Sequence, residues 1–344
     1  MAEKSRYNYR VEPQDVDFTL RATIPSLGGS ILNTAGIDAH GKGFGVDALN
    51  ADNHSWVLSR MAVEFDCQPT QYTDYTVATW ISDYGRVLST RNFTLTDAAG
   101  REFGRAVTQW AMIDLQSRSA IDLSWVGDAH ADAIVDAAPP TDKPRKIRAV
   151  SPTATAEHRV VYSDIDFNRH VNTMRYIEMM LDMLPVDMLT QEAPVRLDIH
   201  FLKECRFGQT LTVGCELRGR SALDLSWVGD AHADAIVDAP SPTDKPRKIR
   251  EVNPAQTVEH KVVYSDIDFN RHVNTMRYIE MMIDMLPVEL LMQETPVRFD
   301  IHFLRECRYG QTLSVGYEQR GRTALFEIRS DEGTPAVRAS IEWK

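Results

Sequence analysis

The sequence predicts an α+β protein made of three related units, and three observations support this. One block recurs at a constant offset of 102 residues, so that Asp164 returns as Asp266 and Trp125 as Trp227. Each copy has one segment with apolar residues at helical spacing, followed by segments that alternate apolar and polar residues. The N-terminal third shows the same order with almost no matching letters. One helix followed by antiparallel strands predicts a helix layer against a sheet.

The elements of each copy follow in a fixed order. In the first copy, residues 157–166 alternate as a strand, residues 171–185 have helical spacing that ends at a proline, and residues 195–205 and 209–219 read as strands. Only the second copy continues into residues 324–330 and 336–343, which predict a hairpin turned at Asp331 to Gly333. The second copy is therefore complete and the first is truncated.

The N-terminal unit is predicted from the same signals. Residues 10–18 read as a strand and residues 26–41 as a helix ending at Gly41. Three further strands are expected at 75–85, 89–100 and 101–115, with a turn at Asp97 to Gly100.

The repeat and its linkers set the expected domain boundaries. The copies part after Leu223 and Leu325, so the last 19 residues, 326–344, have no counterpart in the first copy. An unequal crossover inside a shorter parent would leave this pattern, and removing 102 from 344 residues leaves a parent of 242. Pro-rich, charged segments mark linkers. The expected organisation is an N-terminal unit at 1–122, a linker at 123–152, a truncated copy at 153–222, a repeated linker at 223–254 and a complete copy at 255–344.

Composition narrows the class of protein. A formal charge of −11 disfavours a nucleic-acid binder, because phosphate contacts need a basic surface. No apolar run has the length of a signal peptide or a membrane helix, so we expect a cytoplasmic protein without membrane insertion. The four cysteines stand singly and are expected as reduced thiols: Cys67, Cys205, Cys215 and Cys307.

A polar cluster between a strand and a helix start is the first candidate site. Helix capping explains any one of its members but not all five. A calcium loop of the EF-hand type is excluded, because Arg169 stands where that loop needs Gly and Arg175 where it needs Glu. The chain also has no HExxH motif and no paired Cys ligands, so neither a metal nor a cofactor is expected. The cluster comprises Asp164, Asp166, Asn168, His170 and Asn172.

A second candidate lies at a strand end in each copy, in LKEC (202–205) and LREC (304–307). A Glu beside a Cys at this position is a base, a nucleophile or a strand end that enters solvent. The residues alone leave these alternatives open.

The two segments together resemble a known family. DIDFNRHVNTMRYIE resembles the DxDxNxHVNNxxYxxW signature of the acyl-acyl-carrier-protein thioesterases, and LKEC and LREC resemble the REC segment of that family. WVLSRMAVEF (56–65) and YTVATW (75–80) resemble its N-terminal half, and Thr275 departs from the signature, where Asn is common. The resemblance covers nearly the whole chain. It implies hotdog folds, each a long helix wrapped by an antiparallel sheet, and a bacterial type of parent.

The resemblance also implies the catalytic residues. It makes Glu306 the base, with Asp268 and His272 as orienting or proton-transfer partners and Asn270 as a donor to the oxyanion. A Cys307 nucleophile is the minor alternative, since its thiolate would need an activating neighbour. The equivalents in the first copy are Asp166, Asn168, His170, Glu204 and Cys205.

Truncation of the first copy leads us to expect that the second copy pairs with the N-terminal unit and forms the working site. Lengthening the connection from about 35 to about 137 residues costs only about 1.2 kcal/mol, which is less than the loss of two buried strands. One alternative is that the first copy docks and completes its sheet with residues 222–227. Another is that the two copies pair with each other.

The expected function is hydrolysis of fatty acyl-acyl-carrier-protein thioesters, with the acyl carrier protein as partner and a homodimer as one option. An acyl-coenzyme-A thioesterase and a non-catalytic acyl-binding protein are the alternatives. Because the carrier protein is acidic, a basic landing surface is expected. The candidates are Arg271 and Arg277, with Lys143, Arg145, Lys146 and Arg148 and their repeats Lys245, Arg247, Lys248 and Arg250.

Overall fold

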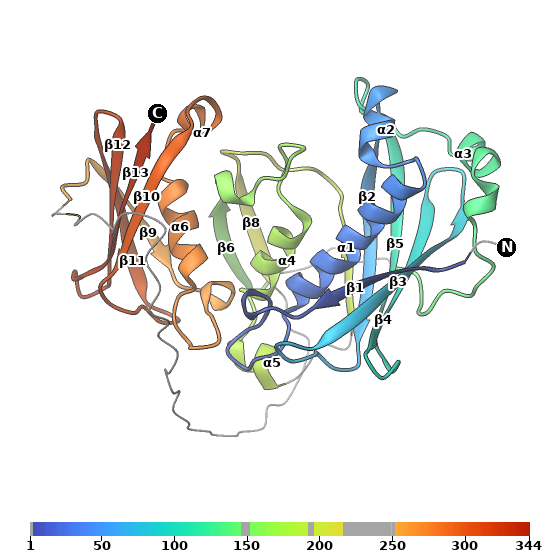
Figure 1. Cartoon of the computed structure of the whole chain (residues 1–344), viewed down its shortest axis with the longest axis horizontal. Coiled ribbons are helices and arrows are strands. Elements are labelled where there is room, and N and C mark those ends of the chain that lie inside the picture. The colour runs from blue at the N-terminus through green and yellow to red at the C-terminus, as the bar shows by residue number, and fades with distance from the viewer. Residues whose placement is uncertain (1–2, 146–151, 192–195, 216–248, 250–251) are drawn as a thin grey trace, which may run out of the picture. The chain divides into compact units, whose positions relative to one another are not determined.

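The computed structural model describes residues 3–145, 152–191, 196–215, 249 and 252–344 (Figure 1). The chain divides into two compact units. The first contains residues 1–160 and 164–216, and the second contains residues 217–344 with 161–163.

The N-terminal part of the first unit is one long helix against an antiparallel sheet (Figure 1). Helix α1 (Ile24–Gly41) begins at the cap Thr23, whose side chain accepts a hydrogen bond from the Ser26 N–H, and it ends at Gly41 as predicted. The sheet order is β1-β3-β4-β5-β2, followed by β7 of the first copy. The strands are β1 (Ser5–Arg10), β2 (His54–Phe65), β3 (Asp74–Tyr84), β4 (Ser89–Asp97) and β5 (Glu102–Asp114).

The apolar core of this part lies between α1 and the sheet. Apolar residues of the helix, including Leu27 and Ile31, are almost fully buried, as are Trp80 and Phe93 of the sheet. A charged pair, Asp38 and Arg91, is buried in the same layer. Burial opposes ionisation of Asp38, but the charge of Arg91 and the hydrogen bonds from Ser5, Arg91 and Lys42 together outweigh it and lower the pKa of the carboxyl.

The predicted strand at residues 10–18 is wrong. The strand is β1, which ends at Arg10, and a short 3-10 turn (Pro13–Asp15) follows it. Pro13 occupies the first turn, where its missing N–H is tolerated, and its ring favours the turn over a strand. The other predicted strands of this part are confirmed, and their bounds shift by a few residues.

The segment expected as the first linker contains helix α3 (Ser124–Ala129) and a 3-10 turn (Ala131–Ala133). A further short helix, α2 (Val46–Ala51), precedes β2 in the N-terminal part. Leu123 and Val126 of the α3 segment are buried against Leu49 and Met112. Residues 123–126 therefore pack on the N-terminal core.

The first copy has its sheet in two separate pieces. Strand β6 pairs with β8, whereas β7 joins the sheet of the N-terminal part. The second copy explains the gap, because there two extra strands lie between the counterparts of these pieces. The elements are β6 (Ala154–Arg159), a 3-10 turn (Tyr162–Asp164), α4 (Thr173–Leu181), α5 (Val186–Gln191), β7 (Arg196–His200) and β8 (Thr210–Cys215).

The first copy, contrary to the expected pairing, is docked on the N-terminal part. Strand β7 pairs antiparallel with β2, from Arg60 opposite His200 to Glu64 opposite Arg196. Helix α4 packs on α1, where a Cβ added to Gly28 would lie 2.9 Å from Met174 Sδ. The strands that the first copy lacks belong on the far edge of β7, so their loss leaves the docking edge intact. The proposed replacement strand, residues 222–227, lies outside the described residues.

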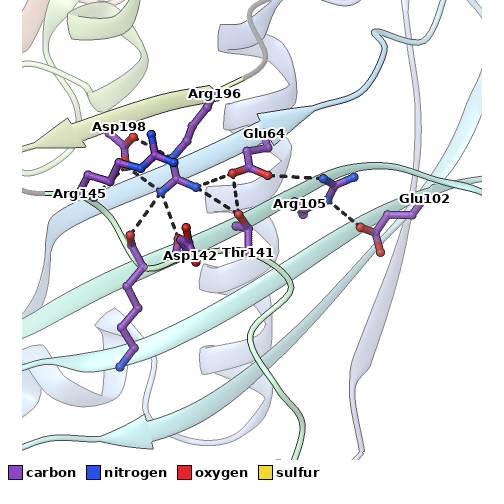
Figure 2. Close-up of polar contacts among 9 residues, drawn as sticks. Glu64, Glu102, Arg105, Thr141, Asp142, Arg145, Arg196 and Asp198 are labelled. Atoms are coloured by element: carbon purple, nitrogen blue, oxygen red, sulfur yellow. Dashed lines mark hydrogen bonds and ion pairs between the residues drawn. The ribbon is translucent and has the colours of Figure 1, made fainter.

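An ion-pair network secures this docking (Figure 2). The Arg196 guanidinium bonds Glu64 of β2, and it also donates to both oxygens of Asp198, at 2.8 and 2.9 Å. Arg105 of β5 lies 3.4 Å from the Glu64 carboxylate. Burial opposes ionisation of Glu64, but hydrogen bonds from Thr141 and Arg196 outweigh it and lower the pKa of the carboxyl. The linker takes part as well, through Thr141.

The second unit contains the complete copy. Its sheet order is β10-β13-β12-β11-β9, and helix α6 packs against it (Figure 1). The predicted final hairpin is confirmed as β12 and β13. The elements are β9 (Gln256–Lys261), a 3-10 turn (Tyr264–Asp266), α6 (Thr275–Ile283), α7 (Val288–Gln293), β10 (Pro296–Phe303), β11 (Thr312–Arg320), β12 (Thr323–Arg329) and β13 (Pro335–Trp343). Among the described residues, no helix has the length and apolar character needed to cross a membrane.

Candidate active site

The loop between β6 and α4 is held in shape by Asp166. Its Oδ1 accepts hydrogen bonds from the backbone N–H groups of Asn168 at 2.8 Å and His170 at 3.2 Å. Arg169, between them, adopts a φ of 63°, in the left-handed region. Asn172 then caps α4 by accepting from the Met174 N–H at 2.8 Å. Asp166 and Asn172 therefore fix the backbone of the loop, and this orients His170 toward the strand end.

A polar cluster forms where the loop meets the end of β7. His170 Nε2 lies 3.2 Å from Glu204 Oε2. The Arg118 guanidinium, which belongs to the turn after β5, contacts both oxygens of the same carboxylate. Glu204 is thus held between an imidazole of the first copy and a guanidinium of the N-terminal part. A carboxylate fixed in this way is suited to accept a proton from water.

A tyrosine of α4 fixes the segment that carries Glu204. The Tyr176 hydroxyl accepts a hydrogen bond from the Cys205 N–H at 3.1 Å, and the Val171 N–H donates to the Cys205 carbonyl at 2.9 Å. Burial, then interaction with Cys205, raises the pKa of Tyr176, so the hydroxyl stays protonated. These two bonds join loop, helix and strand end into one rigid site.

The second copy reproduces the local geometry. Asp268 Oδ1 accepts from the N–H groups of Asn270 at 2.8 Å and His272 at 3.2 Å, and His272 Nε2 lies 3.0 Å from Glu306 Oε2. The Cys307 N–H donates to the Tyr278 hydroxyl at 3.2 Å. The shared letters therefore fold the same way in both units.

The carboxylates of the two copies differ in their surroundings. The Glu204 side chain is 34% exposed, whereas that of Glu306 is 66% exposed. Within the described part of the second unit, no arginine contacts Glu306. The residue that stands to Glu306 as Arg118 stands to Glu204 in the repeat is Arg220, which lies outside the described residues. Among the described residues, a contact with an arginine is therefore present at Glu204 and not at Glu306.

A cavity of about 830 Å³ leads to the first site. Helix α1 lines it with Gly29 and Gly36, where an added Cβ would meet no atom within 4 Å. The N-terminal part lines it mostly with apolar side chains, together with Ser55, Ser89 and Arg91, and the first copy adds the polar residues of the site. The lining residues include Leu32, Trp56, Leu58, Ile81, Trp110, Arg118, Asn168, His170, Met174 and Glu204. This shape suits a long apolar chain with a polar group at one end.

The structure brings together most of the residues that the sequence indicated. Asp166, Asn168, His170 and Glu204 gather at one end of the cavity. Cys205 and Cys307 act through their backbone groups, and burial raises the pKa of the Cys307 thiol, which disfavours it as a nucleophile. The described residues contain no group of side chains arranged to hold a metal ion.

Sequence reasoning missed Arg118 and Tyr176. Tyr176 had a signal, because it stands at the tyrosine of the quoted signature. Arg118 opens the repeat and recurs as Arg220 and Arg322, but nothing in the letters links it to Glu204, 86 positions away.

The proposed basic landing surface is only partly described. Lys143 pairs with Asp83 at 3.3 Å, and Arg277 pairs with Glu280 at 2.8 Å. Several of its candidates lie outside the described residues: Lys146, Arg148, Lys245, Arg247, Lys248 and Arg250.

A helix packed against an antiparallel sheet, with 18 residues in α1 of the N-terminal part and 9 in α6 of the second unit, defines a hotdog-fold protein of the α+β class. Its first unit carries an apolar cavity with a His–Glu pair at one end. The chain belongs to the acyl-ACP thioesterase family: residues 2–124 match the N-terminal domain of that family, and residues 148–238 and 249–344 match its C-terminal domain.

Named relatives agree with this family. An acyl-acyl-carrier-protein hydrolase of Cuphea viscosissima is 28% identical over 184 residues, 51% of this chain and 42% of the relative. A palmitoyl-acyl carrier protein thioesterase of Arabidopsis thaliana is 24% identical over 248 residues, 67% of this chain and 60% of the relative. Both relatives are chloroplastic by name, and the chain spans 42% and 60% of their lengths.

Among solved structures, an acyl-ACP thioesterase from Bacteroides thetaiotaomicron is similar, with 26% identity, a TM-score of 0.48 and coverage of 99% of this chain and 98% of the other. A 12:0-ACP thioesterase from Umbellularia californica has 14% identity, a TM-score of 0.45 and coverage of 99% and 97%.

Proposed function

We propose that this protein hydrolyses the thioester of fatty acyl-acyl carrier protein, releasing the free fatty acid, at the site of the first unit. The observation that carries the proposal is the continuous cavity, which runs from the apolar interior under α1 to Glu204 and His170. An acyl chain in the cavity would place its thioester beside Glu204, His170 and Arg118, which lie together in the lining. Family membership supports the same reaction.

The chain's own residues supply the parts that thioester hydrolysis needs. Glu204, assisted by His170, removes a proton from water, and the water oxygen attacks the thioester carbonyl. Asn168 lines the cavity and also a second, smaller pocket that shares Arg118 and His170 with it, and in this scheme its amide donates to the oxyanion that forms. The carbon–sulfur bond then breaks, and the proton passes from the Glu204–His170 pair to the leaving thiolate.

Arg118 acts in this scheme as a positioning residue. Its two contacts with the Glu204 carboxylate fix the direction of the base. Arg322 is a control arginine of the second unit, since it pairs with Glu294 and not with the carboxylate of Glu306. Arg118→Ala should lower kcat more than it changes KM, and Arg322→Ala should leave both unchanged.

The decisive experiment compares Glu204→Gln with Glu306→Gln in the full chain, using a panel of acyl-acyl carrier proteins. Glutamine keeps the shape of the side chain and removes its basicity. We expect Glu204→Gln to lower kcat by a factor of about 10² to 10⁴ and Glu306→Gln to retain wild-type turnover. The reverse pattern would assign the reaction to the second copy.

The same assay separates the remaining candidates. Equal turnover of acyl-coenzyme A and acyl carrier protein substrates would indicate the coenzyme A alternative. A folded protein that binds fatty acid and hydrolyses neither substrate would be the non-catalytic acyl-binding protein.

We also propose how the repeat arose and where the protein is located. The constant offset of 102 residues supports a tandem duplication inside a 242-residue parent of bacterial type. The cytoplasm remains the proposed location.

A further inference from the structure

Strand β10 of the second unit has an open edge. Among the described residues it pairs with β13 alone, so the backbone groups of its other edge have no strand partner. Strand β7, whose sequence RLDIH corresponds to RFDIH in β10, uses the same edge to pair with β2. An unpaired edge of this kind is a template for another strand.

The surface beside this edge is apolar. Met276 of α6 is 56% exposed, and Val297, Phe299 and Phe303 of β10 are 55%, 39% and 50% exposed. Phe303 lies against the ring of Tyr278 of α6, so Phe299, at the same alternation of the strand, shares the face that α6 covers. The register irregularity between Pro296 and Arg298 sets Val297 apart from this alternation.

The first copy shows what covers such a surface. There the counterpart of Met276, Met174, packs against Gly28 of α1, and the counterpart of β10 is bonded to β2. A neighbouring hotdog thus supplies both a helix and a strand. In each chain, however, β7 already pairs with that edge of β2, so β2 is not available as the partner of β10.

We propose that the second unit pairs with the second unit of another copy of this chain, through β10 and α6. The two faces are identical, so a two-fold axis makes each open edge the partner of the other. The resulting arrangement repeats the side-by-side pairing of hotdogs seen within the first unit.

Charge selects the register of the two strands. Arg298 Nε lies 2.7 Å from Asp300 Oδ2 on the same strand. A register with Phe299 opposite Phe299 of the partner subunit places Arg298 opposite Asp300 of the partner subunit, and the reciprocal pair forms across the axis. A register centred on Asp300 would instead set two carboxylates against each other.

The first test is the mass in solution, measured by light scattering across a concentration series. The wild-type chain should approach twice 38.9 kDa as concentration rises. Phe299→Asp should remain at the single-chain mass, because it places two carboxylates at the axis. The control is Val258→Asp, on the opposite edge strand β9, where Val258 is 53% exposed; it should behave as wild type.

The second test keeps the proposal falsifiable if Phe299→Asp fails to fold. Phe299→Cys should form a covalent dimer under mild oxidation, because opposed residues of paired strands have Cβ atoms about 4.5–5.5 Å apart. Val258→Cys and the wild type, which carries exposed Cys67, set the background. A wild-type chain that stays monomeric, or a dimer that Val258→Asp breaks and Phe299→Asp does not, would overturn the proposal.

Discussion

Replacing Arg196 with alanine removes the central cation of the interface between β2 and β7. Arg196 bonds Glu64 across the two strands and Asp198 on its own strand, and it donates to the Thr141 hydroxyl at 3.1 Å (Figure 2). Its side chain is 9% exposed, and those of Glu64 and Asp198 are 19% and 15% exposed. The substitution therefore leaves two largely buried carboxylates without their main partner.

The size of the effect follows from this burial. Removing one member of a buried ion pair costs about 3–5 kcal/mol. Arg105 still lies 3.4 Å from Glu64 and offsets part of the loss, so we expect the lower end of this range. A change of about 3 kcal/mol corresponds to about two orders of magnitude in the population of undocked first copy.

Hydrogen exchange of the full chain measures this population directly. In Arg196→Ala, the amides of β2 and β7 should exchange about a hundred times faster, and thioester hydrolysis should fall with docking. Arg298→Ala is the matched control, because Arg298 makes the same bonds to Asp300 in the second unit. The reasoning is refuted if Arg298→Ala abolishes hydrolysis while Arg196→Ala leaves both exchange and hydrolysis unchanged.

Three further outcomes are expected. Arg118→Ala should lower kcat in the wild-type background and have little added effect beside Glu204→Gln, because the two residues act as one unit; additive losses would contradict this. The docked interface should weaken in acid. Docking lowers the pKa values of Glu64 and Asp198 below their usual values of 4.5 and 3.8. The stability that the two carboxylates contribute is therefore present above pH 4.5 and 3.8, respectively, and is lost as the pH falls through the lowered pKa values. Urea midpoints of the first unit between pH 7 and pH 3.5 should therefore decline more steeply than in Arg196→Ala. Cys205→Ala should retain hydrolysis, since Cys205 contributes backbone bonds; loss of turnover in a folded variant would restore the thiol mechanism.

Several features were set by local patterns in the chain. The helix ending at Gly41 follows from a cap, an apolar stripe and a terminal glycine, and the final hairpin follows from two alternating segments around a turn. The polar loop folds identically in both copies, because its hydrogen bonds join residues only two to four positions apart. Such short-range bonds can be predicted from the order of the letters.

Long-range packing, and not local sequence, selects the copy that meets the N-terminal part. Arg196 and Arg298, with Asp198 and Asp300, are the same letters at the same offset, so local sequence does not distinguish them. The choice depends on which strand edges remain open after folding, and the edge of β7 that meets β2 is intact although the strands beyond its other edge are missing. The contact of Arg118 with Glu204 is a consequence of that docking. Local sequence therefore specifies the elements and the chemical groups, whereas long-range packing brings the groups into one site.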